Sequence, residues 1–219
     1  MRMFAAALLL FLCFAPGCGS GMRWDSHDDS SATSDKIGPE VLRAVNAPRK
    51  DDRQMALRMM AEKAGDLRRQ GRRNEAAEIE DIIIRRYFIE KEQDVRAAIV
   101  RICAPSVGRG STAMVKFLRD RIAAGEFPGY AALSLASLSP RDVYADIVPL
   151  TRHPAPEVRL QAATALAVLG DPRGYDSVVR VWKGMQESIW PEKVDGMSLA
   201  EARSGLETRA RRSFGKDLR

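Results

Sequence analysis

Residues 156–182 read PEVRLQAATALAVLGDPRGYDSVVRVW and contain two helical patterns separated by a turn signal. Apolar residues recur at helical spacing in both halves, first at Val158, Ala162, Leu166 and Leu169 and then at Tyr175, Val178, Val179 and Trp182. Between them, Gly170 suits the left-handed position after a helix, Asp171 can cap the next helix, and Pro172 fits a first turn, where no amide hydrogen is needed. The stretch therefore predicts two antiparallel helices joined by a tight turn.

The same hairpin recurs upstream. The opening Asp94-Val95-Arg96 parallels Glu157-Val158-Arg159, which lies 63 residues later, or two units of about 31 to 32 residues. Likewise, LASLSPR at 135–141 parallels LAVLGDPR at 166–173. Each such unit has an apolar stripe on both helices and cannot cover it alone, so successive units must stack. We expect an all-α fold, an α-solenoid of stacked antiparallel helix pairs.

These residues resemble the HEAT family in its short bacterial form, similar to the repeats of phycobilisome lyases. The shared signs are the Asp/Glu-Val-Arg opening, the Ala-rich first helix and the Leu-Gly-Asp-Pro turn at 169–172. The resemblance covers residues 91–185, although the middle unit has Phe127-Pro128 where Val-Arg is expected. Pro149 lies inside the second helix of that unit and should kink it, because proline removes a hydrogen bond.

The resemblance also implies that the second helices of the units line a concave surface. If the apolar pairs Phe117-Leu118 and Val178-Val179 set the register, Arg119 and Arg180 are equivalent positions on that surface. The candidate partner-binding residues are Lys116, Arg119, Arg180 and Lys183. Ordinary exposed cations are the alternative interpretation of the same four residues.

Both flanks of the repeats are predicted to be capping elements. In residues 39–90, Met55 to Gln70 and Asn74 to Phe88 form a helix pair, whose turn at Gly71 to Ala76 resembles that of a tetratricopeptide hairpin. Residues 186–219 form a linker and a C-terminal capping helix, which the capping-box pattern Ser198-Leu199-Ala200-Glu201 opens.

The first 17 residues, MRMFAAALLLFLCFAPG, are typical of an export signal. Arg2 precedes an apolar run from Met3 to Ala15 that ends in small residues, and the run is shorter than the about 20 residues of a membrane-spanning helix. A shortened permanent anchor is the alternative. Residues 18–38 are rich in Ser, Gly and Asp and contain too little apolar surface to order, so we expect a flexible, disordered tether.

The residues Ala15-Pro16-Gly17-Cys18 resemble the lipobox of bacterial lipoproteins, although Ala15 stands where Leu is more common and Pro16 is unusual. The resemblance implies that Cys18 is lipidated and becomes the new N-terminus. More than one acyl chain gives stable membrane attachment. We expect an exported protein of the bacterial cell envelope, lipid-anchored to the inner or the outer membrane. Secretion with a free Cys18 is the alternative.

The composition narrows the possible functions. Aromatic residues are 6% of the chain, which favours helices over strands, and the net charge of +6 is too small for a dedicated nucleic-acid binder. After removal of the signal and lipidation of Cys18, Cys103 is the remaining free thiol, so we expect no disulfide.

Few residues suggest chemistry. His27 lies in the acidic tether, and His153 is expected to interact with the last carbonyls of a helix. Cys103 falls in the apolar register of Ile99, Val100 and Ile102 and predicts a buried small side chain rather than a nucleophile. Gly108-Arg109-Gly110-Ser111 predicts an inter-helix turn rather than a phosphate loop, because no strand precedes it. We therefore expect no catalytic residues, metal, cofactor or small-molecule substrate.

The sequence favours a non-enzymatic scaffold that binds a protein or peptide partner on its concave second-helix face. An outer-envelope assembly factor is an alternative, suggested by lipidation and the tetratricopeptide-like turn. A lyase or nucleic-acid enzyme with HEAT-like repeats is a further alternative, which an export signal disfavours because such enzymes act inside the cell.

Overall fold

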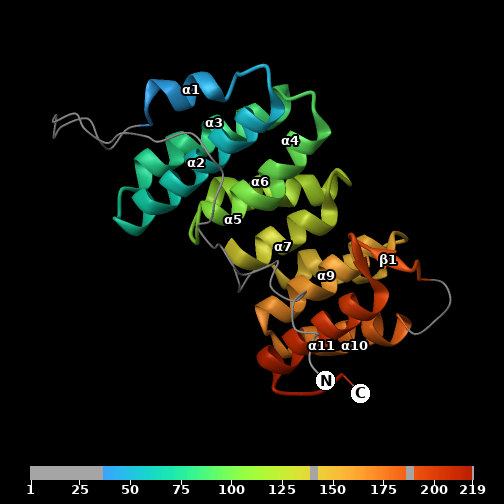
Figure 1. Ribbon diagram of the computed structural model, residues 1–219. Helices are drawn as coiled ribbons and strands as arrows, with labels where there is room; N and C mark the ends of the chain where they lie inside the picture. The colour runs from blue at the N-terminus through green and yellow to red at the C-terminus, as the bar shows by residue number, and fades with distance from the viewer. Residues whose placement is uncertain (1–36, 139–142, 186–189, 219) are drawn as a thin grey trace, which may run out of the picture. The chain divides into compact units, whose positions relative to one another are not determined.

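The computed structural model describes residues 37–138, 143–185 and 190–218. This part of the chain is mostly helical and contains little strand, which confirms the all-α fold class. The elements, several of them labelled in Figure 1, are α1 (Pro39–Ala44), α2 (Lys50–Arg69), α3 (Arg73–Ile89), α4 (Gln93–Ala98), η1 (Ile99–Cys103), α5 (Ala104–Ser106), α6 (Thr112–Ala123), α7 (Pro128–Leu138), α8 (Tyr144–Ile147), η2 (Val148–Arg152), α9 (Pro156–Leu169), η3 (Pro172–Gly174), α10 (Tyr175–Gly184), β1 (Lys193–Val194), β2 (Met197–Ser198) and α11 (Leu199–Phe214).

The α9–α10 hairpin has the turn that its sequence predicts. Gly170 ends α9 in the left-handed region, with φ of 65°, where a side chain would be strained. Asp171 Oδ1 accepts a hydrogen bond from the amide of Arg173 at 3.0 Å and so caps the short 3₁₀ turn η3 that begins with Pro172. The two halves of the hairpin therefore pack as antiparallel neighbours.

Pro149 interrupts the second helix of the middle unit as expected. The regular helix α8 ends at Ile147, and the chain continues as the 3₁₀ helix η2. Proline has no amide hydrogen and disfavours regular α-helix in the residue before it. The second helix of this unit is therefore much shorter than α6 or α10.

A π-helical segment lies inside the helix that runs from Gln93 to Ser106. The amide of Ala104 donates to the carbonyl of Ile99, five residues back, rather than to that of Val100. Pro105 cannot supply a replacement donor, so the Val100 carbonyl has no donor within its own helix. The buried Ser134 of α7 fills this role, because its Oγ donates to the Val100 oxygen at 2.6 Å.

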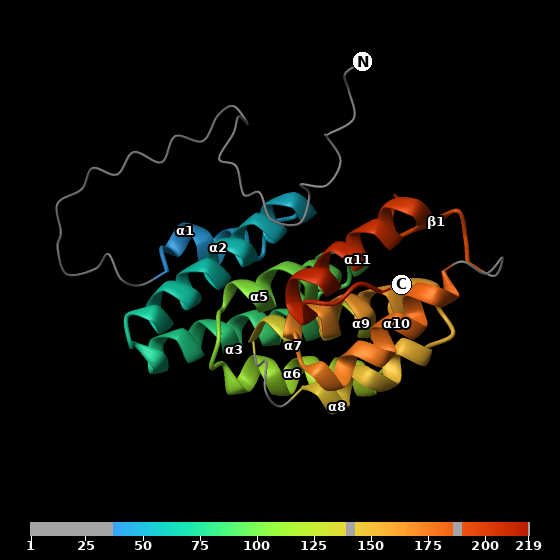
Figure 2. The same ribbon diagram turned by 90° about the horizontal axis from the view of Figure 1, so that it is seen from below.

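The first helices of the pairs follow one another in contact. α2 packs against η1 and α5, which pack against α7; α7 packs against α9, and α9 against α11. Among the second helices, α3 packs against α6, and α10 packs against η2. Figures 1 and 2 show α9, α10 and α11 lying side by side. The buried apolar side chains form one connected cluster between these helices, from Val45 to Leu218.

The C-terminal flank contains a feature that the sequence did not predict. Residues 193–198 form a two-stranded antiparallel hairpin with Val194 opposite Met197, and Asp195 and Gly196 form its turn at positive φ. The Asp195 carboxylate accepts hydrogen bonds at 3.1 Å from Tyr130 of α7 and from Gln161 of α9. The hairpin is thus fastened to two neighbouring first helices.

The helix that follows this hairpin begins as predicted. The Ser198 hydroxyl accepts from the Glu201 amide at 3.3 Å, and a Glu201 carboxylate oxygen accepts from the Ser198 amide at 2.9 Å. This reciprocal pair is a capping box. At the other end of the described chain, α2 begins at Lys50 rather than near Met55, so the first predicted helix is longer than its apolar pattern indicated.

Candidate partner-binding surface

The four predicted cationic residues lie on two second helices. They are Lys116 and Arg119 on α6 and Arg180 and Lys183 on α10. The short helix α8 connects the two: Arg119 Nε donates to Asp146 Oδ2 of α8 at 2.9 Å, and the Tyr144 hydroxyl donates to the Arg173 carbonyl, just before α10, at 2.8 Å. The structure therefore places the four residues as two pairs on either side of α8.

The two pairs differ in how their charge is balanced. Lys116 Nζ lies 2.9 Å from Asp120 Oδ2, and Arg119 pairs with Asp146. Arg180 and Lys183 are exposed and have no ion pair with any residue that the structure describes. The cations of α10 are therefore the more available ones, because a partner that binds Lys116 or Arg119 must compete with an existing carboxylate.

The burial pattern aligns α6 with α10 in a different register from the one that the apolar pairs Phe117-Leu118 and Val178-Val179 suggested. Met114, Phe117 and Leu118 of α6 are buried, and the matching buried positions near α10 are Gly174, Ser177 and Val178, which lie 60 residues later. In this register Arg180 corresponds to Asp120, and Arg119 to the half-buried Val179. The assumed equivalence of Arg119 and Arg180 is therefore one residue out of step, because Ser177 and Gly174 occupy core positions without being large apolar residues.

An aromatic cluster at the contact between α3 and α6 was not predicted. The Tyr87 and Phe117 rings meet edge to face with centroids 5.0 Å apart, and the Phe88 ring lies 5.5 Å from Tyr87. The Arg121 guanidinium lies 5.1 to 5.6 Å from all three ring centroids. The Tyr87 hydroxyl and Arg121 both donate to Glu126, at 2.7 and 2.5 Å. This network holds Phe88 in place although its side chain is mostly exposed.

A second network joins the end of α3 to the α1–α2 connection. The buried Glu90 carboxylate accepts from Arg53 at 2.9 Å, from Arg86 at 2.7 Å and from the Glu92 amide at 3.0 Å. Arg53 also donates to the Pro48 carbonyl at 2.8 Å. Burial alone would raise the pKa of Glu90, but the Glu92 amide and the two guanidinium groups outweigh it and lower the pKa to about 2.

The turn at 108–111 takes part in a third network, which fixes the start of α6. The Ser111 hydroxyl accepts from the Met114 amide at 3.0 Å and donates to the buried Glu80, which also binds Arg68. Arg68 Nη1 in turn donates to the Gly110 carbonyl at 2.9 Å. The predicted inter-helix turn is confirmed, and its polar groups are used by the protein's own side chains.

Two other residues considered for a chemical role, Cys103 and His153, take part in packing and in a backbone hydrogen bond. Cys103 is buried as predicted, and burial raises the pKa of its thiol to about 12, so the thiol is protonated at neutral pH. The expectation for His153 was wrong in detail: its Nδ1 accepts a hydrogen bond from the Ala155 amide at 3.1 Å rather than donating to a helix carbonyl. Cys18 and His27 lie outside the described residues.

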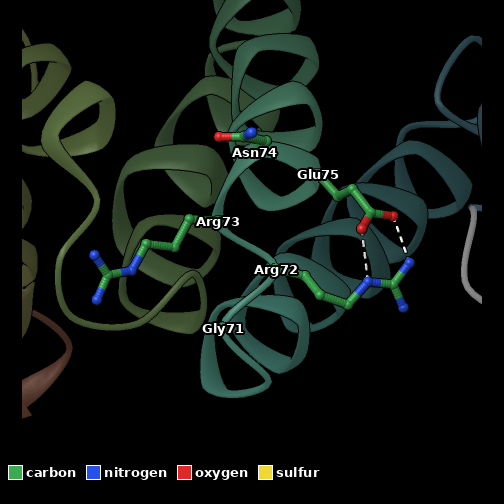
Figure 3. A pocket seen from close by; sticks show the side chains of 5 residues that line it. All are labelled: Gly71, Arg72, Arg73, Asn74 and Glu75. Atoms are coloured by element: carbon green, nitrogen blue, oxygen red, sulfur yellow. Dashed lines mark hydrogen bonds and ion pairs between the residues drawn. The ribbon is translucent and has the colours of Figure 1, made fainter.

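A shallow hollow lies at the α2–α3 turn, lined by residues 71–75 (Figure 3). Within it Arg72 and Glu75 form a two-point ion pair, with Nε to Oε1 at 2.6 Å and Nη2 to Oε2 at 2.5 Å. Figure 3 shows Arg73 and Asn74 pointing away from this pair. Arg72 and Glu75 therefore neutralise each other, and Arg73 does not converge with them on a common point.

No protein-family model, no curated protein and no solved structure matches this chain. The described residues contain no group of three or more His, Cys, Asp or Glu side chains placed to hold a metal ion. Among the helices that the structure describes, none combines the length and the hydropathy needed to span a membrane.

Proposed function

We propose that this protein is a lipid-anchored, non-enzymatic scaffold of the bacterial cell envelope that binds a protein or peptide partner on its layer of second helices. In this proposal the helix pairs form a short α-solenoid of the HEAT type. The lipid on Cys18 attaches it to a membrane. The helices α3, α6, α8 and α10 supply the surface that faces the partner.

The observation that carries the proposal is the cationic side of α10. Arg180 and Lys183 lie three residues apart, so they share one face of the helix, and both are exposed. Because neither forms an ion pair with a described residue, both can bind carboxylates of a partner without displacing a carboxylate of the described part of the chain. An acidic partner segment is therefore the expected ligand of this surface.

Charge reversal on α10 tests the partner surface. We expect Arg180→Glu combined with Lys183→Glu to abolish a specific cross-linked species that the parent protein forms in intact cells. Arg69→Glu is the control and should retain that species, because Arg69 is an exposed cation of α2, outside the proposed partner surface, and pairs with Asp66. Equal amounts of the cross-linked species from the α10 variant and the parent would show that α10 is not part of the partner surface.

Metabolic labelling tests the anchor separately. We expect the native protein to incorporate a fatty-acid analogue and to fractionate with membranes, and Cys18→Ala to lose the label. Incorporation that does not change on substitution of Cys18 contradicts lipidation at this residue.

A further inference from the structure

An arginine on α11 carries a partly buried positive charge with no carboxylate paired to it in the described chain. Arg203 is half-buried, and its guanidinium carbon lies 4.1 Å from the ring centroid of Trp182 on α10. Arg203 forms no hydrogen bond and no ion pair with a residue that the structure describes. A cation that loses part of its water and gains no acceptor is unfavourable, so this position indicates an anion that the described chain does not supply.

The stack on Trp182 determines which nitrogen atoms of Arg203 are available. Nε is buried without an acceptor, whereas the terminal Nη atoms are not among the buried unpaired atoms and therefore reach the surface. A guanidinium that lies over an aromatic ring keeps its N–H groups in its own plane, where they stay free to donate. Arg203 can therefore bind both oxygens of one carboxylate through its Nη1 and Nη2 groups.

Two further cations lie near this arginine. Lys183 follows Trp182 directly in α10, and Arg180 lies three residues earlier on the same exposed face. α10 and α11 pack side by side (Figure 2). The three cations therefore come from both helices of one seam, and none has an ion pair with a described residue.

The charges of these two helices and the segments beside them do not balance. Residues 171–185 and 190–218 contain nine cations and seven carboxylates. Five of the carboxylates are already bound by the protein: Asp171 by Arg173, Asp195 by Tyr130 and Gln161, Glu201 by the Ser198 cap, and Glu207 and Asp217 by Arg211. The two others are Asp176 and Glu192. They are outnumbered by the cations of these stretches that have no ion pair with a described residue, which are Arg180, Lys183, Lys193, Arg203, Arg212 and Lys216.

We propose that the α10–α11 seam binds an acidic peptide segment of the partner, with Arg203 as the residue that fixes one of its carboxylates. This inference rests on the proposed function and extends the partner surface from the four second helices to α11. A chain of carboxylates suits the arrangement, because Arg180, Lys183 and Arg203 are spread over two helices. Trp182 already orients the guanidinium, so binding costs the Arg203 side chain little conformational entropy.

Fluorescence anisotropy with a labelled hexaglutamate peptide tests the site. The full chain is titrated into the peptide at low ionic strength, where charges are weakly screened. We expect Arg203→Gln to raise the Kd at least about tenfold, because it removes a two-point charged contact. Arg203→Lys should lose most of the same affinity, since an ammonium group is a point charge without the planar fork. A hexaglutamine peptide should not bind.

Arg49→Gln is the matched control. Arg49 is an exposed cation just before α2 and has no ion pair with a described residue, so the substitution removes the same charge outside the seam. Its Kd should stay within about twofold of the parent. Equal Kd values for Arg203→Gln and Arg49→Gln would overturn the role of Arg203.

Two outcomes separate this site from the proposed function. If Arg180→Gln combined with Lys183→Gln weakens binding while Arg203→Gln does not, this inference fails and the α10 surface of the proposed function stands. If the parent protein does not bind hexaglutamate, the acidic ligand of the proposed function fails together with this site.

Chemical modification of the parent protein tests the contact without a substitution. Phenylglyoxal reacts with accessible guanidinium groups, and mass spectrometry of the digested protein measures the modification of each arginine. We expect hexaglutamate to lower the modification of Arg203 several-fold and to leave that of Arg49 unchanged. Unchanged modification of Arg203 would overturn the site even if Arg203→Gln does not fold. Inorganic phosphate at the same concentration should not protect Arg203; protection by phosphate would show a site for a single small anion and would overturn the peptide segment.

Discussion

At the scale of single residues, the π-helical segment leaves the Val100 carbonyl without a hydrogen-bond donor in its own helix, so another helix must supply one. The π-helical hydrogen bond to Ile99 takes the amide of Ala104 away from Val100, and Pro105 has no amide hydrogen to offer. A buried carbonyl without a donor is costly, so the hydroxyl of Ser134 links two helices 34 residues apart.

We expect Ser134→Ala to lower the free energy of unfolding by about 1–3 kcal/mol, the cost of leaving a buried carbonyl unpaired. Urea denaturation followed by circular dichroism measures this change. Ser137→Ala is the control: Ser137 is exposed, and its hydroxyl donates to the Leu133 carbonyl within the same helix, so its loss should matter little. Equal effects of the two substitutions would show that the Val100 carbonyl finds another donor.

Glu90 makes stability depend on pH. Its folded pKa of about 2 lies below the usual value of 4.5, so its ionised form stabilises the fold above pH 4.5, and this contribution is lost as pH falls towards 2. We expect Glu90→Gln to lower the free energy of unfolding by about 3 kcal/mol at pH 7, because Arg53 and Arg86 lose their shared carboxylate.

Unfolding measured at several pH values separates the loss of the Glu90 charge from a loss of packing. The difference between the parent and Glu90→Gln should shrink between pH 4.5 and 2, as Glu90 in the parent protein becomes protonated. Glu92→Gln, which removes an exposed carboxylate on the same connection, should show no such narrowing. A constant difference across this range would mean that the loss comes from packing and not from charge.

At the scale of elements, the packing of α7 against α9 depends on Gly129. A Cβ atom built there would lie 1.9 Å from Gln161 Oε1 and 2.9 Å from Gln161 Cβ, both far inside normal contact distances. Gln161 also donates to Asp195 of the β-hairpin. The absence of a side chain at position 129 therefore keeps both the helix contact and the attachment of the hairpin.

We predict that Gly129→Ala destabilises the protein by about 1–3 kcal/mol through overpacking, with thermal unfolding as the measurement. Gly205→Ala is the matched control within a helix. No heavy atom lies within 4 Å of a Cβ atom built at Gly205, so alanine should raise stability by up to about 1 kcal/mol through its better helix propensity. The two substitutions should shift the melting temperature in opposite directions, and a downward shift for both would contradict this account.

The sequence predicted the helices and their ends better than the contacts between helices. The helices, the Gly170 turn, the Ser198 cap and the break at Pro149 could be read locally, because each depends on a few neighbouring residues. The exposure of Phe88, the ion pair of Arg119 and the register of α10 could not, because they depend on contacts between helices. The hairpin at 193–198 carries an Asp-Gly turn signal, but its strands have only two residues each, too few to show a pattern.

At the scale of the whole described chain, one apolar cluster joins the helices from Val45 to Leu218. Leu166 lies near its C-terminal part and is fully buried in α9, which contacts α7, α10 and α11. A defect at this position therefore affects several helices together.

We expect Leu166→Ala to cost about 2–5 kcal/mol and Val168→Ala, at an exposed position of the same helix, less than about 0.5 kcal/mol. Tryptophan fluorescence reports mainly on the C-terminal helices and circular dichroism on all of them. In the Leu166→Ala variant the two signals should change at the same urea concentration. Separate midpoints would show that the N-terminal helices unfold independently of the rest.

The shortness of α8 limits what a ligand of the second-helix layer can look like. Between α6 and α10, this layer consists of one α-helical turn followed by the 3₁₀ segment Val148–Arg152. A 3₁₀ helix has three residues per turn and so aligns side chains three apart, whereas the flanking α-helices have 3.6 residues per turn. A partner that binds this layer as proposed must therefore match a different side-chain spacing on the middle unit from the one on α6 and α10.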